Sequence, residues 1–315
     1  VDSVILDMNL CDYLYVPDTA KCQNVNLREM LAHQARLFPF IPFYKNTINN
    51  GVLDSNIYSK YPSPNYSIKI TDNLYLKNTY RDSIRSIIFN YKMLENKQYK
   101  YSDLGYYFLK DIDEKYGNAP LNILADSLFY ARLGASTLTY LPKEKFPLAR
   151  IVPSEIDSTF RRQLLRGEVN DPSAAMLGGV AGHAGLFSNA NDLAKLFQMY
   201  LNNGEYGGVQ YLDSAVIKEY TRCQFCKEGN RRGAGFDKPT GDKDGPTYTY
   251  VSRESFGHTG FTGTIAWADP DKQIVYIFLA NRTYPNANLS NKLLKYNIRT
   301  RIQEVIYNSM KEQVN

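Results

Sequence analysis

The 315-residue sequence contains only four cysteines, three histidines and one tryptophan. A structural zinc site uses about four cysteine or histidine ligands. Cys223 and Cys226 form a lone Cys-x-x-Cys pair, with no second such pair and no paired histidines, so we expect no bound metal. Cys11 and Cys22 form the other potential disulfide. Either pair is expected to be oxidised only if the protein is exported.

Long apolar runs and blocks of like charge are also missing. No stretch approaches the length of a membrane-spanning helix, and no signal peptide is visible. The 37 Lys and Arg residues are scattered among 32 Asp and Glu residues, and the net charge is +5. This mixture is typical of a solvated surface and does not predict nucleic-acid binding. Because no Gly-Lys-Ser/Thr phosphate loop occurs, we expect neither a nucleotide nor another cofactor.

The stretch from Gly257 to Thr264 is the most distinctive one present. Three glycines and three threonines surround His258, and two apolar segments follow, Thr264–Ala268 and Gln273–Ala280. Their β-branched and aromatic residues, separated by a turn, predict adjacent antiparallel strands. Glycine at a strand edge permits the close approach of a ligand or of another backbone. His258 is therefore either structural or part of an acyl-transfer site.

Helical periodicity appears on both sides of this hairpin. Val25–Gln34 predicts a helix with Asn26 as its N-cap, and His33 near its end is expected to be a buried structural residue. The segment 293–307 predicts an amphipathic helix that covers one face of the sheet. Residues 38–79 show no clear period and predict a long surface loop. Further helices are expected at 81–94, after Asp103, at 121–129 and after Asp192.

Two other stretches carry polar or glycine-rich patterns. Tyr101-Ser102-Asp103 precedes a helix, and Asp103 serves there either as a helix cap or as a site residue. Between Gly178 and Phe187, small residues are so dense that we expect tightly packed backbone beside a cavity.

These motifs, in this order, resemble those of serine hydrolases of the class C β-lactamase, penicillin-binding-protein and esterase superfamily. The resemblance rests on Tyr101-Ser102-Asp103, on the loop 178–187 leading into Asn191-Asp192-Leu193-Ala194, and on His258-Thr259-Gly260. Leu27–Leu37 is also similar to that family's helix ending in a Leu-Leu-Thr-His-Thr-Ser-Gly-Leu-like run.

The resemblance implies an α+β, β-lactamase/transpeptidase-like fold, in which helices cover an antiparallel sheet and a mainly helical lobe packs beside it. Residues 1–315 would form a single domain, with the helical lobe at about 25–200 and the sheet lobe at about 205–315.

One part of the family pattern is missing, the nucleophile motif Ser-x-x-Lys. No serine in this sequence has Lys three residues later. Since acyl-enzyme chemistry depends on that serine and lysine, two interpretations remain. Either an N-terminal segment that carries the nucleophile precedes Val1, or the protein is a non-catalytic relative. The first interpretation is favoured because the other motifs are intact, and the chain would then be the C-terminal part of a longer protein.

The resemblance also implies roles for individual residues. Tyr101 would shuttle a proton, with a pKa lowered by neighbouring cations. Asp103 stands where the family usually has Asn, and His258 where it commonly has Lys, so their substrate contacts should differ. The Phe261 N–H would donate to the oxyanion. The substrate-binding and oxyanion residues implied by the resemblance are Thr259, Gly260, Phe261, Gly182 and His183.

The form of the glycine-rich motif from Gly179 to Ser188 is similar to that of a cell-wall-recycling branch of the family. Some members of this branch are fused to a glycoside hydrolase family 3 module. This implies a peptidoglycan-derived muramyl peptide as substrate, cut at an amide bond, in a bacterial periplasm or cell envelope. The implied partners are the substrate and the upstream segment or fused module. The alternative is a module that binds wall fragments without cleaving them. Glycosidase activity is not expected, because no carboxylate pair is distinguished by its surroundings.

Overall fold

The structure is a computed structural model that describes residues 4–243, 245–289 and 292–312. Its α-helices are α1 (Val4–Asp7), α2 (Leu10–Tyr13), α3 (Leu27–Leu31), α4 (Tyr80–Asn90), α5 (Leu104–Gly117), α6 (Leu121–Ala125), α7 (Pro172–Met176), α8 (Ala190–Leu201), α9 (Ser214–Thr221), α10 (Lys292–Lys295) and α11 (Ile298–Glu312). None of the helices within these ranges combines the length and apolarity needed to span a lipid bilayer.

The strands in the described ranges form five antiparallel groups. The three-stranded sheets are β10 (Phe256–Thr259), β11 (Ile265–Asp269) and β12 (Ile274–Phe278), and β3 (Tyr58–Ser59), β5 (Leu74–Leu76) and β4 (Ile68–Thr71), each in that spatial order. The two-stranded ones are β1 (Ile48–Asn49) with β2 (Val52–Leu53), β6 (Glu155–Asp157) with β7 (Gln163–Leu165), and β8 (Glu205–Tyr206) with β9 (Val209–Gln210).

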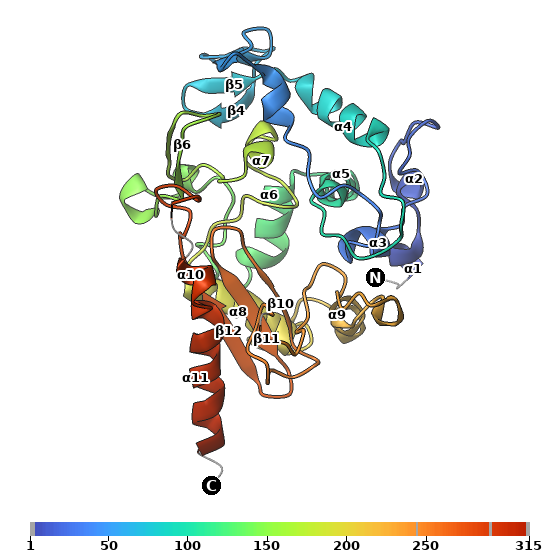
Figure 1. Cartoon of the computed structure of the whole chain (residues 1–315), viewed down its shortest axis with the longest axis vertical. Helices are drawn as coiled ribbons and strands as arrows, with labels where there is room; N and C mark the ends of the chain where they lie inside the picture. The colour runs from blue at the N-terminus through green and yellow to red at the C-terminus, as the bar shows by residue number, and fades with distance from the viewer. Residues whose placement is uncertain (1–3, 244, 290–291, 313–315) are drawn as a thin grey trace.

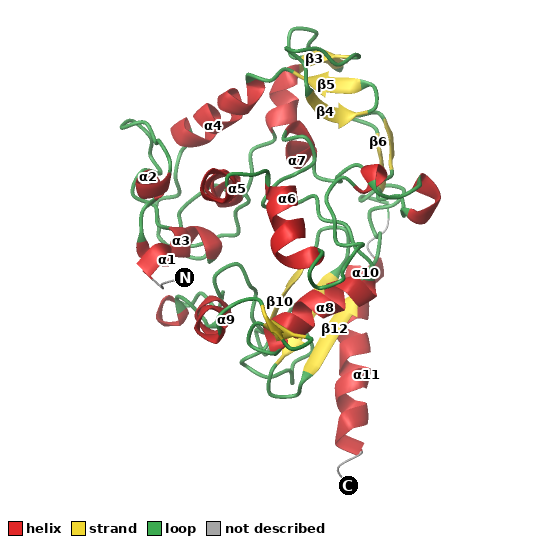
Figure 2. Ribbon diagram, turned by 180° about the vertical axis from the view of Figure 1, so that it is seen from behind, coloured by secondary structure: helices red, strands yellow, loops and turns green. Residues whose placement is uncertain are grey.

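The sheet β10–β11–β12 lies between two helices (Figures 1 and 2). The predicted pairing of the last two strands is confirmed, because Trp267 lies opposite Tyr276 in the antiparallel register. Alternation along β11 separates the faces: Ala268 packs with Phe197 of α8, whereas Trp267 packs with Tyr276 on the other face. Small residues on the α8 side allow that helix to approach the sheet closely.

The C-terminal helix covers the other face, as predicted, but it is not one continuous segment. Asn297 has a φ of 48°, in the left-handed region, and it separates α10 from α11. Helix α11 is joined to the sheet by hydrogen bonds. The Tyr276 hydroxyl donates to the Arg299 carbonyl over 2.9 Å, and the Tyr307 hydroxyl donates to Asp269 Oδ2 over 2.5 Å.

Asp269 lies at the centre of the contact between α11 and the sheet, and replacing it tests that contact. Its carboxylate is buried and also accepts from Ser252 Oγ and from the amides of Ser252 and Lys272. Asp269→Ala leaves these buried donors unpaired, so we expect the free energy of unfolding to fall by about 3 kcal/mol in denaturant titration. Asp271→Ala, at an exposed position of the same turn, is the control. Equal stabilities of the two variants would contradict this packing.

The helical part of the molecule has its own core around α3 and α5. Leu27, Met30, Leu104 and Phe108 are buried in one cluster. Gly105 lets the two helices pack closely, since a Cβ at this position would lie 3.0 Å from the Met30 Cβ, a tighter contact than most in folded proteins. The close contact of α3 with α5 fixes the segment before α5, which contains Tyr101.

The predicted helix at 25–34 is shorter than expected. Asn26 is its N-cap, as predicted, because its side chain accepts from the Glu29 amide over 2.8 Å. The helix ends at Leu31, and His33 adopts a φ of 55°. The backbone thus leaves the helix before His33 and turns this side chain toward Ser102.

The prediction of a long irregular loop at 38–79 was wrong. The five strands β1–β5 and a 3-10 turn, η1 (Phe43–Thr47), lie within it. Strands of two to four residues are too short to show a periodic pattern, which is why the sequence did not reveal them. The helix expected at 121–129 is also divided, into α6 and a π-helical turn, η2 (Asp126–Tyr130).

Candidate active site

His258 lies near the end of β10 in a half-buried position. Its Nε2 is 2.8 Å from Arg232 Nη1, and its Nδ1 is 2.7 Å from the Thr259 carbonyl oxygen. Since arginine can only donate, Nε2 must accept and Nδ1 must carry the proton. Burial, followed by the charge of Arg232, lowers the pKa of His258. The imidazole is therefore neutral at pH 7, and the positive charge beside it belongs to Arg232.

Arg232 is held by contacts on several sides. It is 6% exposed, its Nη2 donates to the Tyr99 hydroxyl over 3.1 Å, and its Nε is 3.3 Å from Asp237 Oδ1. Its guanidinium carbon lies 5.5 Å from the ring centroids of both Tyr99 and Tyr101. Sequence reasoning missed this residue, because Arg232 is 26 residues from His258 and belongs to no recognisable motif.

Tyr101 lies next to His258, with 6.1 Å between the ring centroids, and it is 39% exposed. The pKa of Tyr101 was expected to be lowered by neighbouring cations, but it is raised. Burial and the nearby carboxylate of Asp103 raise the pKa of the phenol, and these effects outweigh the lowering by Arg232. At neutral pH Tyr101 is thus a protonated hydrogen-bond donor.

Asp103 occupies the N-cap position of α5, but its side chain makes no capping bond. Ser102 makes the local bonds in its place, because its Oγ accepts from the Leu104 amide and donates to the Phe38 carbonyl. The Asp103 carboxylate lies close enough to the Tyr101 phenol for each group to affect the pKa of the other. Burial raises the pKa of Asp103, and Asp171 adds to the increase.

The His33 ring packs against the Tyr101 ring, with 4.3 Å between the ring centroids. It is 3% exposed, and its Nδ1 lies 3.1 Å from the Ser102 carbonyl oxygen and 3.2 Å from the Ser102 amide nitrogen. Burial lowers its pKa to about 3. His33 is therefore the buried structural histidine that was predicted, and it stays neutral at physiological pH.

Gly182 and His183 pack against the first turns of α5. A Cβ on Gly182 would lie 2.4 Å from the Tyr106 carbonyl oxygen, so glycine is required for this contact. The His183 ring stacks on Tyr107 at 4.7 Å, and its Nε2 lies 3.2 Å from Asp171 Oδ1. The His183 side chain is only 3% exposed. Its contacts join the glycine-rich loop to α5.

The chain turns sharply after β10. The Gly263 amide donates to the Gly260 carbonyl over 3.0 Å, and the register of β10 with β11 ends at Thr259. Phe261 lies at the tip of this turn, 68% exposed, with its ring 4.6 Å from the Arg282 guanidinium carbon. The Phe261 amide thus lies outside the ladder, beside the strand that carries His258.

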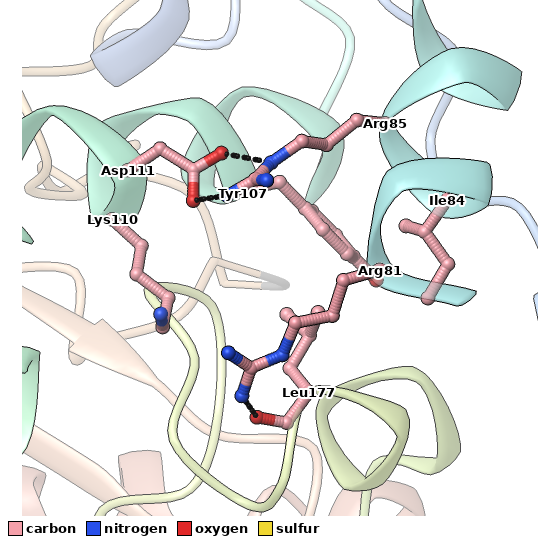
Figure 3. Close-up of a pocket in the computed structure, with 7 residues that line it drawn as sticks. All are labelled: Arg81, Ile84, Arg85, Tyr107, Lys110, Asp111 and Leu177. Carbon is pink, nitrogen blue, oxygen red and sulfur yellow. Dashed lines mark hydrogen bonds and ion pairs between the residues drawn. The ribbon is translucent and has the colours of Figure 1, made fainter. Parts of the chain in front are cut away.

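A small cavity lies apart from these residues, between α4, α5 and Leu177 (Figure 3). Its volume is about 20 Å³, space for a single water-sized molecule. Arg85 forms a bidentate ion pair with Asp111, and Arg81 Nη2 donates to the Leu177 carbonyl. None of the expected site residues lines this cavity. Its contacts anchor the start of the glycine-rich loop.

Comparison with known proteins identifies the family. A family model described as Beta-lactamase matches residues 3–295. An Escherichia coli K12 protein, provisionally named a D-alanyl-D-alanine carboxypeptidase, is 34% identical over 197 residues, which are 58% of this chain and 45% of that protein. A Salmonella typhi protein with the same provisional name is 30% identical over 252 residues, 76% of this chain and 56% of its own length. The chain spans about half the length of these curated relatives.

Solved structures show the same fold at low sequence identity. A penicillin-binding protein homologue from Caulobacter crescentus has a TM-score of 0.57 and 18% identity, covering 88% of this chain and 70% of its own. EstCE1, described as a hydrolase with promiscuous acyltransferase activity, has a TM-score of 0.58 and 16% identity, covering 93% and 77%. The expected α+β, β-lactamase/transpeptidase-like fold is confirmed. The protein belongs to the β-lactamase family.

Proposed function

We propose that this chain provides the substrate-binding side of a serine acyl hydrolase, an amidase, peptidase or esterase that acts on peptidoglycan-derived muramyl peptides. The observation that carries the proposal is the assembly of Tyr101, His258 and Arg232 at one place, from segments far apart in the sequence. The Ser-x-x-Lys nucleophile would lie on a segment that precedes Val1. Membership of the family and the provisional name of the curated relatives support this proposal.

The proposed reaction is acyl transfer through a serine ester. The serine oxygen attacks the amide carbonyl, and the lysine of the same motif accepts its proton. The Phe261 amide donates to the oxygen that becomes negative. When the carbon–nitrogen bond breaks, the protonated phenol of Tyr101 is suited to give its proton to the leaving amine. Water then hydrolyses the ester and releases the acid.

Arg232 provides the recognition of substrate charge in this proposal. Its guanidinium is fixed by Tyr99 and Asp237 before any substrate binds. Arginine binds carboxylates through paired N–H donors. We therefore infer that Arg232, beside His258, binds the free C-terminal carboxylate of a peptide substrate.

This assignment predicts a difference between two substrates. In the protein completed by its upstream segment, Arg232→Gln should raise KM for a peptide with a free C-terminal carboxylate by about 100-fold, the effect of one charged hydrogen-bonded pair. KM for the same peptide with a C-terminal amide should change by less than about threefold, because that peptide has no carboxylate for Arg232 to bind. Arg231→Gln, which alters the neighbouring arginine paired with Asp237, is the control. Equal effects on both peptides would exclude carboxylate binding by Arg232.

The second candidate is a wall-fragment-binding module without catalysis. The absence of Ser-x-x-Lys from all 315 residues favours it, and Arg232 would serve the same recognition role there. A Ser-x-x-Lys shortly before Val1 in the gene product supports the hydrolase, and its absence supports the module. A fused glycoside hydrolase module would be compatible with either function.

We also propose a cell-envelope location and a single domain with two lobes. The Cys223–Cys226 disulfide supports an oxidising compartment. Cys11 and Cys22 are both free, so the other potential disulfide is not formed. The separate cores around α3 and α5 and around the sheet support a division into two lobes, but α8 (Ala190–Leu201) packs on the sheet rather than on the helical core.

A further inference from the structure

The Cys223–Cys226 disulfide lies in the segment between α9 and β10, and the proposed reaction does not use it. This segment folds back on itself as a small hairpin, residues 223–232. The Gln224 amide donates to the Arg232 carbonyl over 2.8 Å, and the Asn230 amide donates to the Phe225 carbonyl over 3.1 Å. One arm of the hairpin therefore carries the disulfide, and the other carries Arg232.

Both arms are anchored to the helical part of the molecule. Asn230 is 1% exposed, and its Nδ2 donates to the Ala32 carbonyl and to Gln34 Oε1, each over 2.9 Å. Its Oδ1 accepts from the Arg232 amide over 3.0 Å. On the other arm, Gln224 Nε2 donates to the Glu219 carbonyl at the end of α9. The backbone of Arg232 is thus fixed by the neighbours that the hairpin provides.

We propose that the Cys223–Cys226 disulfide is a positioning element of the site: it fixes the shape of the arm at 223–226, whose Gln224 and Phe225 backbone groups pair with the arm that carries Arg232, and it thereby keeps the Arg232 guanidinium against His258. A dithiol or phosphine reductant supplies two electrons, the S–S bond breaks, and each sulfur takes a proton to become a thiol. The covalent constraint on the arm at 223–226 is lost, its pairing with the arm at 230–232 weakens, and the contact of Arg232 with His258 loosens. The anion-binding end of the site would then depend on redox state.

The three histidines of the chain make this proposal measurable by NMR, without any catalysis. The groups that act on His258 are Arg232, Arg231, Asp237, the Thr259 carbonyl and the rings of Tyr101 and His33. Of the charged groups, Arg232 is the closest and lowers the pKa of His258. Loss of its contact should raise the titration midpoint of His258.

The experiment records the imidazole titrations of the oxidised chain, of the chain reduced with a phosphine, and of the Cys223→Ser/Cys226→Ser double variant. Alkylation and mass spectrometry verify the number of free thiols. Arg232→Gln gives the titration midpoint of His258 without its neighbouring cation, which should lie above that of the oxidised chain. The His258 midpoint of the reduced chain and that of the double variant should both shift toward this value. Cys11→Ser, which changes an exposed free cysteine, should not.

His33 separates a local effect from unfolding. It is buried and should stay neutral in every sample that remains folded. An unchanged His258 midpoint after reduction would overturn the proposal, and so would unfolding on reduction, seen as titration of His33 near its ordinary pKa. Because the measurement needs neither a nucleophile nor a substrate, its outcome is independent of the proposed hydrolase activity.

Discussion

The 315-residue chain alone is expected to hydrolyse p-nitrophenyl esters, penicillins and muramyl peptides no faster than binding and an incomplete oxyanion site allow. In enzymes whose catalytic residues are removed, this residual catalysis is about 10³–10⁴-fold over water. The reason is that no serine in the sequence has Lys three residues later. Steady-state assays with the three substrate types provide the measurement.

The matched protein is this chain extended by the upstream segment that the proposed function requires. If that segment carries the serine and lysine, its presence should increase amide or ester hydrolysis by several orders of magnitude, because the acyl-enzyme route becomes available. Replacing the serine of that motif by alanine should return the rate to that of the short chain. Multiple turnover by the short chain at an enzyme-like rate would show that the nucleophile has been assigned to the wrong segment.

Tyr101→Phe in the completed protein is expected to lower kcat by about 10²-fold or more, the contribution of one general acid–base group. The substitution removes the phenolic proton, and the ring remains next to His258 and His33. Tyr106→Phe is a suitable control, because the Tyr106 hydroxyl donates only to a backbone carbonyl, that of Leu31. A similar kcat for the two variants would argue against Tyr101 as the proton donor.

The direction of the Tyr101 pKa adds a pH criterion. Burial and Asp103 raise this pKa, so the phenol remains protonated above the pH at which an ordinary tyrosine ionises. The proton donor is therefore available throughout the neutral and mildly alkaline range. The kcat of the completed protein should show no decline due to Tyr101 below about pH 10. A decline near neutrality that disappears in Tyr101→Phe would indicate a lowered pKa, as the sequence-based argument assumed.

Regular elements of adequate length were predictable from the sequence. The two C-terminal strands have five residues each and alternate between two buried faces, and a turn at Asp269–Lys272 fixes their register. Asn26 was recognisable as a cap because it directly precedes an apolar helical face. Strands β1–β5 were missed because each has only two to four residues and shows no periodicity, although the Asn50-Gly51 turn between β1 and β2 is a hairpin signal that the sequence offered.

The residues of the site likewise divide into those that the sequence identified and those that only the structure shows. Tyr101 and His258 could be selected because each belongs to a short motif, and the structure brings them together. Arg232 has no such motif, and its position depends on the hairpin 223–232 and on Asn230. The pKa of Tyr101 could not be inferred either. Its direction follows from the balance of burial, Asp103 and Arg232, which exists only in the folded protein.

The most direct test of the proposed hydrolase is to locate the serine that reacts. The completed protein is treated with a fluorophosphonate or penicillin label, digested, and analysed by mass spectrometry, with the 315-residue chain treated in parallel. We predict one adduct, on the serine of a Ser-x-x-Lys upstream of Val1, and none on residues 1–315 of either protein. A stoichiometric adduct on a serine within this chain, such as Ser102 beside Tyr101, would contradict the account.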